Sequence, residues 1–331
     1  MKTAFYTFFS VFMIACTGSQ SQPNKTMKDQ TNPLLCDIET GMCEIPSEKN
    51  PGGNQTAAES LEKPVKVIYY TDPICSSCWG IEPQLRKLKL EYGDVLDFEY
   101  RMGGLLPDWS YNSGGISKPA DVAHHWDEVS EYYDMPIDGD LWLEDPLNSS
   151  YPPSIAFKAA QIQSREKAVH FMRELRELVF LKKKNIAKWA NIEEAANRVG
   201  LDIRQLKTDF DGKANELFRE DLELAKQLGV RGFPSMFFVD EKGNTEFVYG
   251  SKAYAFFEVA LLKLASGAKK KMYDKSWNAL FSVYPSLTAR EFAELSDTPR
   301  NESEKQLDEL VAEGKLFKVD TKNGSLWKLK K

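Results

Sequence analysis

The sequence predicts an α/β protein with a mixed β-sheet between helices, followed by a small domain of three helices and a hairpin. Three observations lead to this prediction. A β-branched and aromatic run at residues 65–70 is followed by a Cys-x-x-Cys motif and then a helical segment. A second strand-like run comes directly after a loop rich in glycine at residues 229–234. Beyond residue 267 the pattern changes to short amphipathic helices and a strand–turn–strand.

The composition fits a globular chain. Its 331 residues are 42% hydrophobic and 28% charged, which suffices for one large domain or two modest ones. The formal net charge of −6 gives no electrostatic reason to expect a nucleic-acid partner. We expect no cofactor and no metal ion.

The first residues have the pattern of an export signal. Lys2 is followed by an apolar stretch at residues 4–15, which is shorter than the roughly 20 residues that span a bilayer. The stretch ends in Met-Ile-Ala-Cys, which resembles the lipobox of bacterial lipoprotein precursors. The resemblance implies a signal peptide at 1–15, lipidation of Cys16, and a membrane-anchored protein on the periplasmic side of the cell envelope. Ordinary secretion with cleavage nearby is the alternative.

Residues 16–62 are rich in Ser, Gln, Asn, Lys, Thr, Gly and Pro without a period, and we expect a flexible tether. Cys36 and Cys43 lie inside it, and Gly41 allows a tight turn that lets the two sulfur atoms meet. The pair has three interpretations: a second redox pair that exchanges with the motif downstream, a small structural disulfide, or a metal clip that includes nearby acidic residues.

The Cys-x-x-Cys motif is Cys75-Ser-Ser-Cys78, at the point where a strand passes into the N-terminus of a helix. A helix N-terminus stabilises an anion, so we expect Cys75 to be a thiolate with a pKa below the ordinary value of about 8.5. Cys78 lies one turn further on and can open or close a disulfide with it. A structural disulfide or half of a zinc site are the alternatives, but zinc needs two further ligands at suitable spacing.

Residues 229–234 read Gly-Val-Arg-Gly-Phe-Pro, and this pattern resembles the cis-proline loop of the thioredoxin superfamily. The resemblance implies that Pro234 faces the Cys-x-x-Cys motif and that Pro83 kinks the first helix. It also implies a substrate cleft shaped by Phe233, Pro234 and Trp79, where an extended peptide can pair with the loop backbone as an added strand.

Roughly 125 residues separate the second strand, at 95–102, from this loop. We expect helices at 154–163, 167–183, 189–199 and 202–229, and an apolar stripe in the second of them. A thioredoxin core with a helical insertion at about 105–228 resembles the DsbA-like family, and more closely its FrnE-like and Spx-adaptor branches. The resemblance covers about residues 65–265 of a predicted domain at 63–268. The residues that carry it are Thr71-Asp72-Pro73, Trp79, Gly103-Gly104-Leu105, the run 142–146 and the run 149–152.

Two local features depart from this family or invite another interpretation. Ser76 and Ser77 stand where DsbA has Pro-His, so the histidine that makes DsbA strongly oxidising is missing. His124 and His125 suggest a metal site, but no third ligand stands at helical spacing, and polar packing is the favoured interpretation. The aromatic loop at 109–111 lines a substrate groove or belongs to the core of the insertion.

The C-terminal segment, 271–331, follows a short basic linker. We expect helices at 276–284, from 288 onward and at 301–313, then strands at 315–320 and 325–329, an arrangement that makes a winged helix. Thr288 and Glu291 form a capping box. The segment has a net charge of only +1, and acidic residues dominate its third helix, which disfavours DNA binding. A winged helix after a DsbA-like domain resembles the Spx adaptors, which implies a protein-interaction module.

The leading hypothesis is a cell-envelope protein thiol–disulfide oxidoreductase or isomerase that acts on cysteines of exported proteins through Cys75 and Cys78. It requires a redox partner that recycles the pair. The alternative is a protein-binding adaptor or scaffold of the same fold, in which the disulfide is incidental or regulatory. The direction of the reaction depends on the redox potential of the pair relative to its partners.

Overall fold

A computed structural model of the chain describes residues 36–37, 42–44, 63–110 and 118–330. The predicted signal peptide, the lipidation site Cys16 and most of the predicted tether lie outside the described residues. Two short strands within the tether are described by their backbone: β1 (Cys36–Asp37) and β2 (Met42–Glu44).

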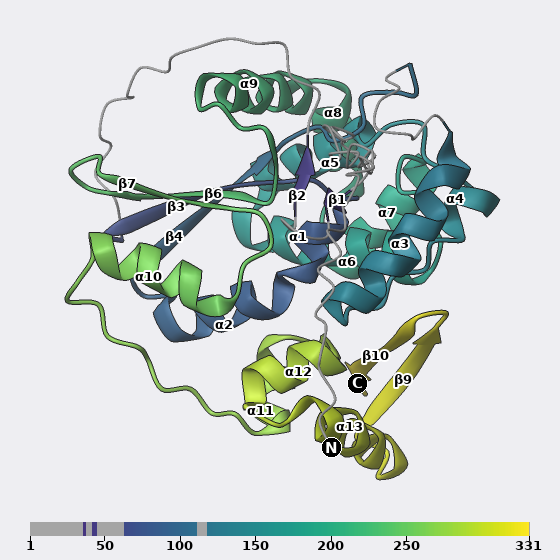
Figure 1. Cartoon of the computed structure of the whole chain (residues 1–331). Helices are drawn as coiled ribbons and strands as arrows, with labels where there is room; N and C mark the ends of the chain where they lie inside the picture. The colour runs from purple at the N-terminus through teal and green to yellow at the C-terminus, as the bar shows by residue number, and fades with distance from the viewer. Residues whose placement is uncertain (1–35, 38–41, 45–62, 111–117, 331) are drawn as a thin grey trace, which may run out of the picture.

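The core of the larger domain is a four-stranded mixed sheet in the order β4 (Leu96–Met102), β3 (Val65–Thr71), β6 (Ser235–Asp240) and β7 (Thr245–Tyr249). The pair β3–β4 is parallel, and the other two pairs are antiparallel. In Figure 1, α2 (Glu82–Tyr92) and α10 (Tyr254–Leu264) lie below the sheet, and α9 (Lys213–Gln227) lies above it. The predicted fold class, a mixed sheet covered by helices on both sides, is confirmed.

The first helix is divided as expected from its proline. A short helix α1 (Ser76–Gly80) ends at Ile81, and α2 begins at the next residue with Pro83 in its first turn. Proline lacks an N–H and fixes its own φ, so it fits the start of a helix and not its interior. The two helices therefore follow one another with a break directly after the Cys-x-x-Cys motif.

The insertion between β4 and the cis-proline loop is helical, as predicted. It holds α3 (Pro119–Tyr133), α4 (Leu141–Glu144), α5 (Tyr151–Gln163), α6 (Arg165–Leu181), α7 (Trp189–Arg198), α8 (Ile203–Asp211) and α9. The single helix expected at 202–229 is wrong, because the chain breaks at Gly212, where φ is −127° and ψ is −110°. The sequence analysis also gave no helix for α3 or α4.

The C-terminal domain contains the expected three helices and hairpin: α11 (Trp277–Val283), α12 (Ala289–Ser296), α13 (Arg300–Ala312), β9 (Leu316–Thr321) and β10 (Gly324–Leu329). A further strand that was not predicted, β8 (Ser286–Thr288), pairs with β10. The predicted capping box is present, since the Glu291 N–H donates to Thr288 Oγ1 at 3.1 Å and the Thr288 N–H donates to Glu291 Oε2 at 2.8 Å.

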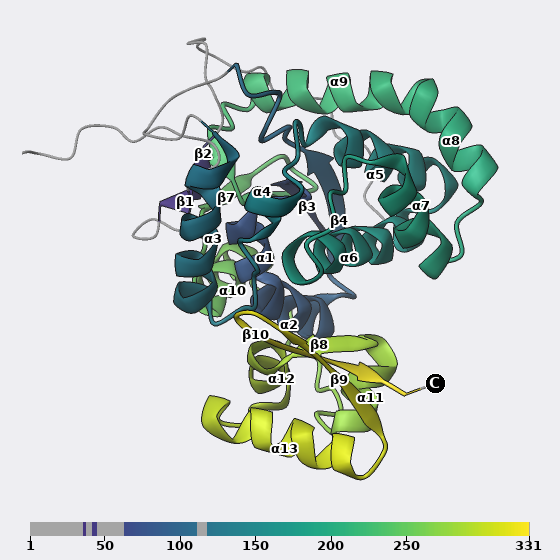
Figure 2. The same ribbon diagram turned by 90° about the vertical axis from the view of Figure 1, so that its right-hand side faces the viewer.

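The C-terminal domain has its own hydrophobic core, which includes Leu280, Phe281, Phe292 and Trp327. Figure 2 shows the domain packed beneath α2, with α12 as the adjoining helix. Arg86 of α2 donates to the Ser286 carbonyl at 2.9 Å across this contact. Across the described part of the chain, no helix is both long enough and apolar enough to cross a membrane.

Candidate active site

The turn before the Cys-x-x-Cys motif is held by a buried carboxyl group. Asp72 follows the last residue of β3, and its side chain accepts hydrogen bonds from the Ile74 N–H at 3.0 Å, the Leu105 N–H at 2.8 Å and the Ser150 hydroxyl at 2.9 Å. Burial raises the pKa of Asp72 to about 6. The family signature Thr-Asp-Pro thus fixes the loop that presents Cys75 to the elements around it.

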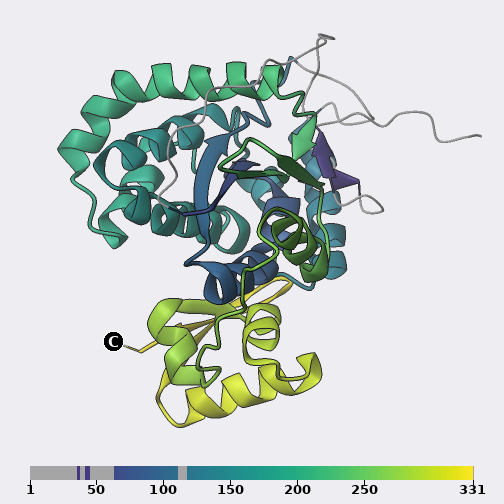
Figure 3. The same ribbon diagram turned by 90° about the vertical axis from the view of Figure 1, so that its left-hand side faces the viewer.

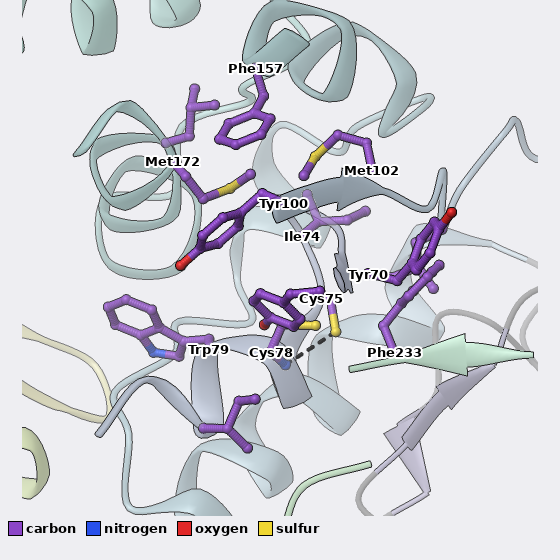
Figure 4. Close-up of a cluster of buried hydrophobic side chains, with 14 of the residues drawn as sticks. Tyr70, Ile74, Cys75, Cys78, Trp79, Tyr100, Met102, Phe157, Met172 and Phe233 are labelled. Atoms are coloured by element: carbon purple, nitrogen blue, oxygen red, sulfur yellow. Dashed lines mark hydrogen bonds between the residues drawn. The ribbon is translucent and has the colours of Figure 1, made fainter. Parts of the chain in front are cut away.

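Cys75 is the N-cap residue of α1, and the Cys78 N–H donates to its Sγ at 3.1 Å. Figure 4 draws this bond as a dashed line within a cluster of buried side chains. The relative exposure of each cysteine is 0%. The sequence prediction that the motif bridges a strand and a helix N-terminus is therefore confirmed.

A buried arginine lies beside the two cysteines. Arg176 of α6 is fully buried, donates to Thr71 Oγ1 at 2.7 Å, and forms an ion pair with Glu82. Its positive charge favours the thiolate form of both sulfur atoms, as one of several influences on the pKa of each. Arg176 was not predicted as a site residue, although a charged residue between the apolar positions of a buried helix indicates a specific role.

The pKa expected for Cys75 is wrong for this conformation. Burial raises the pKa of Cys75 well above its usual range, and the neighbouring Cys78 adds to the increase. Burial alone would raise the pKa of Cys78 as well, but the hydrogen bond from Cys75 and the charge of Arg176 outweigh it, so that this pKa is lowered. Two adjacent buried thiols do not ionise together, and here the Arg176 and Thr71 side chains favour the charge on Cys78.

The dipeptide between the cysteines contacts the insertion. Ser77 Oγ lies 2.8 Å from the hydroxyl oxygen of Tyr133, the last residue of α3. Gly80 permits this approach, because a β carbon at that position would lie 2.5 Å from the Tyr133 ring. Tyr133 is a further residue that the sequence analysis missed. The hydroxyl group of Ser77 thereby ties the motif to α3.

The cis-proline loop is present, and the peptide bond between Phe233 and Pro234 is cis. Phe233 is fully buried and lies against Gly103, where a β carbon would come within 1.7 Å of the ring. Figure 4 shows Phe233 and Tyr70 beside the two cysteines in the same buried cluster. The loop and the Cys-x-x-Cys motif, 155 residues apart in sequence between Cys78 and Phe233, are thus brought together as the resemblance implied.

The edge of this loop pairs with the N-terminal hairpin. Strand β5 (Gly232–Phe233) pairs antiparallel with β2, so that Cys43 is the register partner of Phe233. Strand β2 in turn pairs with β1, where Cys36 is the register partner of Cys43. In Figure 3 these two purple strands lie beside the green strands of the cis-proline region. The backbone position at which we expected a substrate peptide is therefore occupied by a segment of this chain.

The aromatic residues assigned to substrate contact lie in the core. Trp79 is fully buried, its Nε1 donates to the Pro136 carbonyl at 3.1 Å, and its ring stacks on Phe180. Trp109 donates to the Leu147 carbonyl at 2.8 Å and packs edge-on against Trp142. Of the two interpretations of the loop at 109–111, the structure places Trp109 in the core of the insertion.

The two adjacent histidines occupy different environments on α3. His124 lies 3.1 Å from Glu128, whereas His125 is buried. Burial, with a smaller contribution from His124, lowers the pKa of His125 to about 4, so that His125 is neutral at pH 7. Among the described residues, no group of three or more His, Cys, Asp or Glu side chains is arranged to hold a metal ion.

A Cys-x-x-Cys pair at a strand-to-helix junction, facing a cis-proline loop on a mixed sheet, defines a protein of thioredoxin fold. A family model described as thioredoxin matches residues 69–259. The chain belongs to the thioredoxin family and, within it, groups with the relatives named ClpXP adapter protein SpxH. The SpxH protein of Halalkalibacterium halodurans is 34% identical over 309 residues, which cover 91% of this chain and 98% of that protein.

A second relative and a solved structure agree with this assignment. The SpxH protein of Bacillus subtilis is 28% identical over 81% of this chain and 90% of its own length. The structure of a candidate protein disulfide isomerase from Nitrosomonas europaea superimposes with a TM-score of 0.52, at 22% identity, over 62% of this chain and 97% of that chain. This structural likeness supports the fold. The predicted resemblance to the thioredoxin superfamily and its Spx-adaptor branch is confirmed.

Proposed function

We propose that the protein is a thiol–disulfide oxidoreductase or isomerase whose reactive groups are Cys75 and Cys78. One observation carries the proposal: the Cys78 N–H bonds to Cys75 Sγ at the start of α1, while the buried Arg176 guanidinium lies beside both sulfur atoms. A structural disulfide gains nothing from a buried cation that stabilises thiolates. A pair that cycles between dithiol and disulfide does, because the thiolate is the attacking species.

In the proposed reaction the Cys75 thiolate attacks a substrate disulfide, and a mixed disulfide forms as one substrate sulfur leaves. Cys78 then attacks Cys75 Sγ, which releases the second substrate thiol and closes the Cys75–Cys78 disulfide. Cys75 is fully buried in this structure, so a substrate reaches it only after a neighbouring segment moves away. Exposure removes the first cause of the raised pKa of Cys75, namely its burial, and favours the thiolate at the attacking position.

We infer that the substrates are exported proteins with cysteines and that the protein acts from a lipid anchor at Cys16, on the periplasmic side of a membrane. The lipobox-like sequence supports this location, and an oxidising compartment lets disulfides persist. A redox partner must then return the pair to its starting state.

The experiment is a redox titration of the full-length protein in detergent micelles, in glutathione buffers of defined potential. Wild type and a Cys36→Ser/Cys43→Ser variant should both show a two-electron transition that a Cys75→Ser/Cys78→Ser variant lacks. A potential near that of DsbA, about −120 mV, indicates a disulfide donor, and one near that of thioredoxin, about −270 mV, indicates a reductant or isomerase. A pair that glutathione and dithiothreitol cannot cycle would rule out the enzyme.

The attacking cysteine is identified by trapping. A Cys78→Ser variant should accumulate a mixed disulfide between Cys75 and a scrambled protein substrate, and a Cys75→Ser variant should accumulate little. The reverse pattern would assign the attack to Cys78, the cysteine with the lowered pKa in the closed structure.

A protein adaptor is the second candidate. The SpxH relatives named as ClpXP adapters match this chain over 98% and 90% of their own length. The C-terminal domain presents an acidic helix, because Glu302, Glu304 and Glu309 of α13 are exposed. The two candidates are separated by measuring binding to purified ClpXP. An adaptor retains binding in the Cys75→Ser/Cys78→Ser variant, whereas the enzyme proposal requires that this variant lose turnover.

A further inference from the structure

We propose that the N-terminal hairpin is an intramolecular redox partner, with Cys36 and Cys43 exchanging their disulfide with Cys75 and Cys78. The proposal rests on the proposed function and names the first substrate of that site. It also assigns the hairpin to the strand position that an external peptide must occupy, so that the hairpin and the external substrate compete for one edge.

The backbone register at the cis-proline loop places a hairpin cysteine beside the loop. β2 pairs antiparallel with β5, with Cys43 opposite Phe233 and Glu44 opposite Gly232. Peptide recognition by strand addition uses this kind of main-chain pairing to fix one peptide residue opposite one residue of the edge. Because Phe233 directly precedes Pro234, the residue placed opposite the cis-proline loop is a cysteine.

Strand β2 of the hairpin lies close to the reactive helix α1. Residues of β2 come within 8 Å, Cα to Cα, of residues in α1, the helix that begins directly after Cys75. Cysteines joined by a disulfide have Cα atoms about 4.4–6.8 Å apart, so the backbone of β2 lies at a separation from α1 that is close to this range. Figure 1 shows β2 above α1.

The two strands of the hairpin pair so that its two cysteines are register partners. Cys36 and Cys43 are directly opposite in an antiparallel ladder, where Cα atoms lie about 4.5–5.5 Å apart. This separation falls within the range of a disulfide. The same register therefore allows the two hairpin cysteines to bridge each other, and it places one of them on the strand that adjoins the site. The proposal takes up the first of the three interpretations left open by the sequence, a second redox pair that exchanges with Cys75 and Cys78.

The exchange is balanced within the chain. The Cys75 thiolate attacks Cys43 Sγ of the Cys36–Cys43 disulfide, the Cys75–Cys43 bond forms, and Cys36 leaves as a thiolate that takes up a proton. Cys78 loses its proton and attacks Cys75 Sγ, which forms the Cys75–Cys78 bond and releases Cys43, and Cys43 takes up a proton. Two electrons pass from the Cys75–Cys78 dithiol to the hairpin disulfide, and the reverse sequence returns them. Because the hairpin is tethered, its effective concentration is that of an intramolecular partner.

The test is a pair of matched variants of the full-length protein. Cys36→Ser/Cys78→Ser leaves Cys43 with Cys75, and Cys43→Ser/Cys78→Ser leaves Cys36 with Cys75. After oxidation by diamide, peptide mapping without reductant should show an intrachain Cys43–Cys75 disulfide in the first variant. The corresponding Cys36–Cys75 product in the second should be at least about tenfold lower, because Cys36 lies on the outer strand. Equal yields in the two variants, or no intrachain product, would overturn the proposal.

A second measurement uses wild-type protein, so that a folding defect in a variant does not decide the outcome. Fully reduced protein receives one equivalent of diamide, and the disulfides are mapped after acid quenching at successive times. The proposal requires a Cys36–Cys43 disulfide and a Cys75–Cys78 disulfide that interconvert to a constant ratio, and a fixed distribution from the first time point contradicts it. If the Cys36→Ser/Cys43→Ser variant still cycles with glutathione while this exchange fails, the hairpin proposal alone is wrong. If that variant does not cycle, the proposed enzyme function is wrong.

Discussion

Arg173 of α6 and Glu291 of α12 form a bidentate ion pair between the two domains, with Nη1–Oε1 and Nη2–Oε2 distances of 2.8 and 3.0 Å. The Glu291 side chain is fully buried, and it also lies 3.2 Å from Arg86. The Arg173 guanidinium stacks over the ring of Trp79, one residue after Cys78, at 4.4 Å. A buried ion pair therefore links the C-terminal domain to the Trp79 ring of the reactive helix.

Replacing Glu291 by glutamine should loosen the C-terminal domain. Arg173 and Arg86 would each lose one of two carboxylate partners, because Arg173 still pairs with Glu177 and Arg86 with Glu82. Breaking a buried ion pair costs up to about 3–5 kcal/mol. We expect a drop of that order in the free energy of unfolding, measured by urea denaturation. Glu309→Gln is the control, because its pair with Lys305 is exposed and 3.9 Å long, and it should change stability by less than about 0.5 kcal/mol. Equal stabilities of the two variants would show that the interdomain pair is not stabilising.

Arg176→Met should reduce the reactivity of the thiol pair at neutral pH. The substitution removes the positive charge that lowers the pKa of Cys78. The apolar methionine side chain keeps much of the packing of the arginine stem. We expect the thiolate absorbance at 240 nm, at pH 7, to fall by roughly tenfold, as when an ion-pair partner of an acid is removed. Arg198→Met on α7 is the control, since Arg198 pairs with Glu194 and is over a third exposed. An unchanged absorbance titration would show that Arg176 does not affect the pKa of the thiol pair.

The sequence predicted the fold well where local signals were strong. The run at 65–70, the glycine–proline loop before residue 235 and the capping box at Thr288 each specify local structure through composition and punctuation. α3 was not predicted, although its buried residues Val122, Trp126, Val129 and Tyr133 recur at helical spacing and are a signal that the sequence carries.

The candidate site was predicted only in part. Cys75, Cys78 and Pro234 follow from motifs, but Arg176 reaches the cysteines across about 100 residues of sequence, and no spacing rule places it there. The pairing of β2 with β5 joins segments about 190 residues apart. The pKa order of the two thiols was also out of reach, because both are fully buried and the order depends on which sulfur receives the hydrogen bonds and the charge of Arg176.

Gly103→Ala should displace the cis-proline loop. A β carbon at Gly103 would lie 1.7 Å from the Phe233 ring, so the ring and its strand must shift. Overpacking of this kind costs about 1–3 kcal/mol. We expect a loss of that order in the free energy of unfolding. We also expect the reaction with protein disulfides to slow more than the reaction with glutathione, because only protein disulfides need the edge of the loop. Gly267→Ala is the control, since a β carbon at Gly267 would have no described atom within 4 Å beyond its chain neighbours. Equal effects of the two substitutions would contradict the prediction.

Asp72 should give the protein a pH-dependent stability of defined sign. Burial raises its pKa from an ordinary value of 3.8 to about 6 in the folded protein, so between these values the folded state binds more protons than the unfolded state. The stability from this group is fully present below pH 4 and is lost as pH rises through 6, by roughly 3 kcal/mol for a shift of about two pH units. The measurement is urea unfolding of wild type and Asp72→Asn at pH 4, 5, 6 and 7. The wild-type value, relative to the variant, should fall by that amount between pH 4 and 7; a constant difference would mean that Asp72 stays ionised throughout.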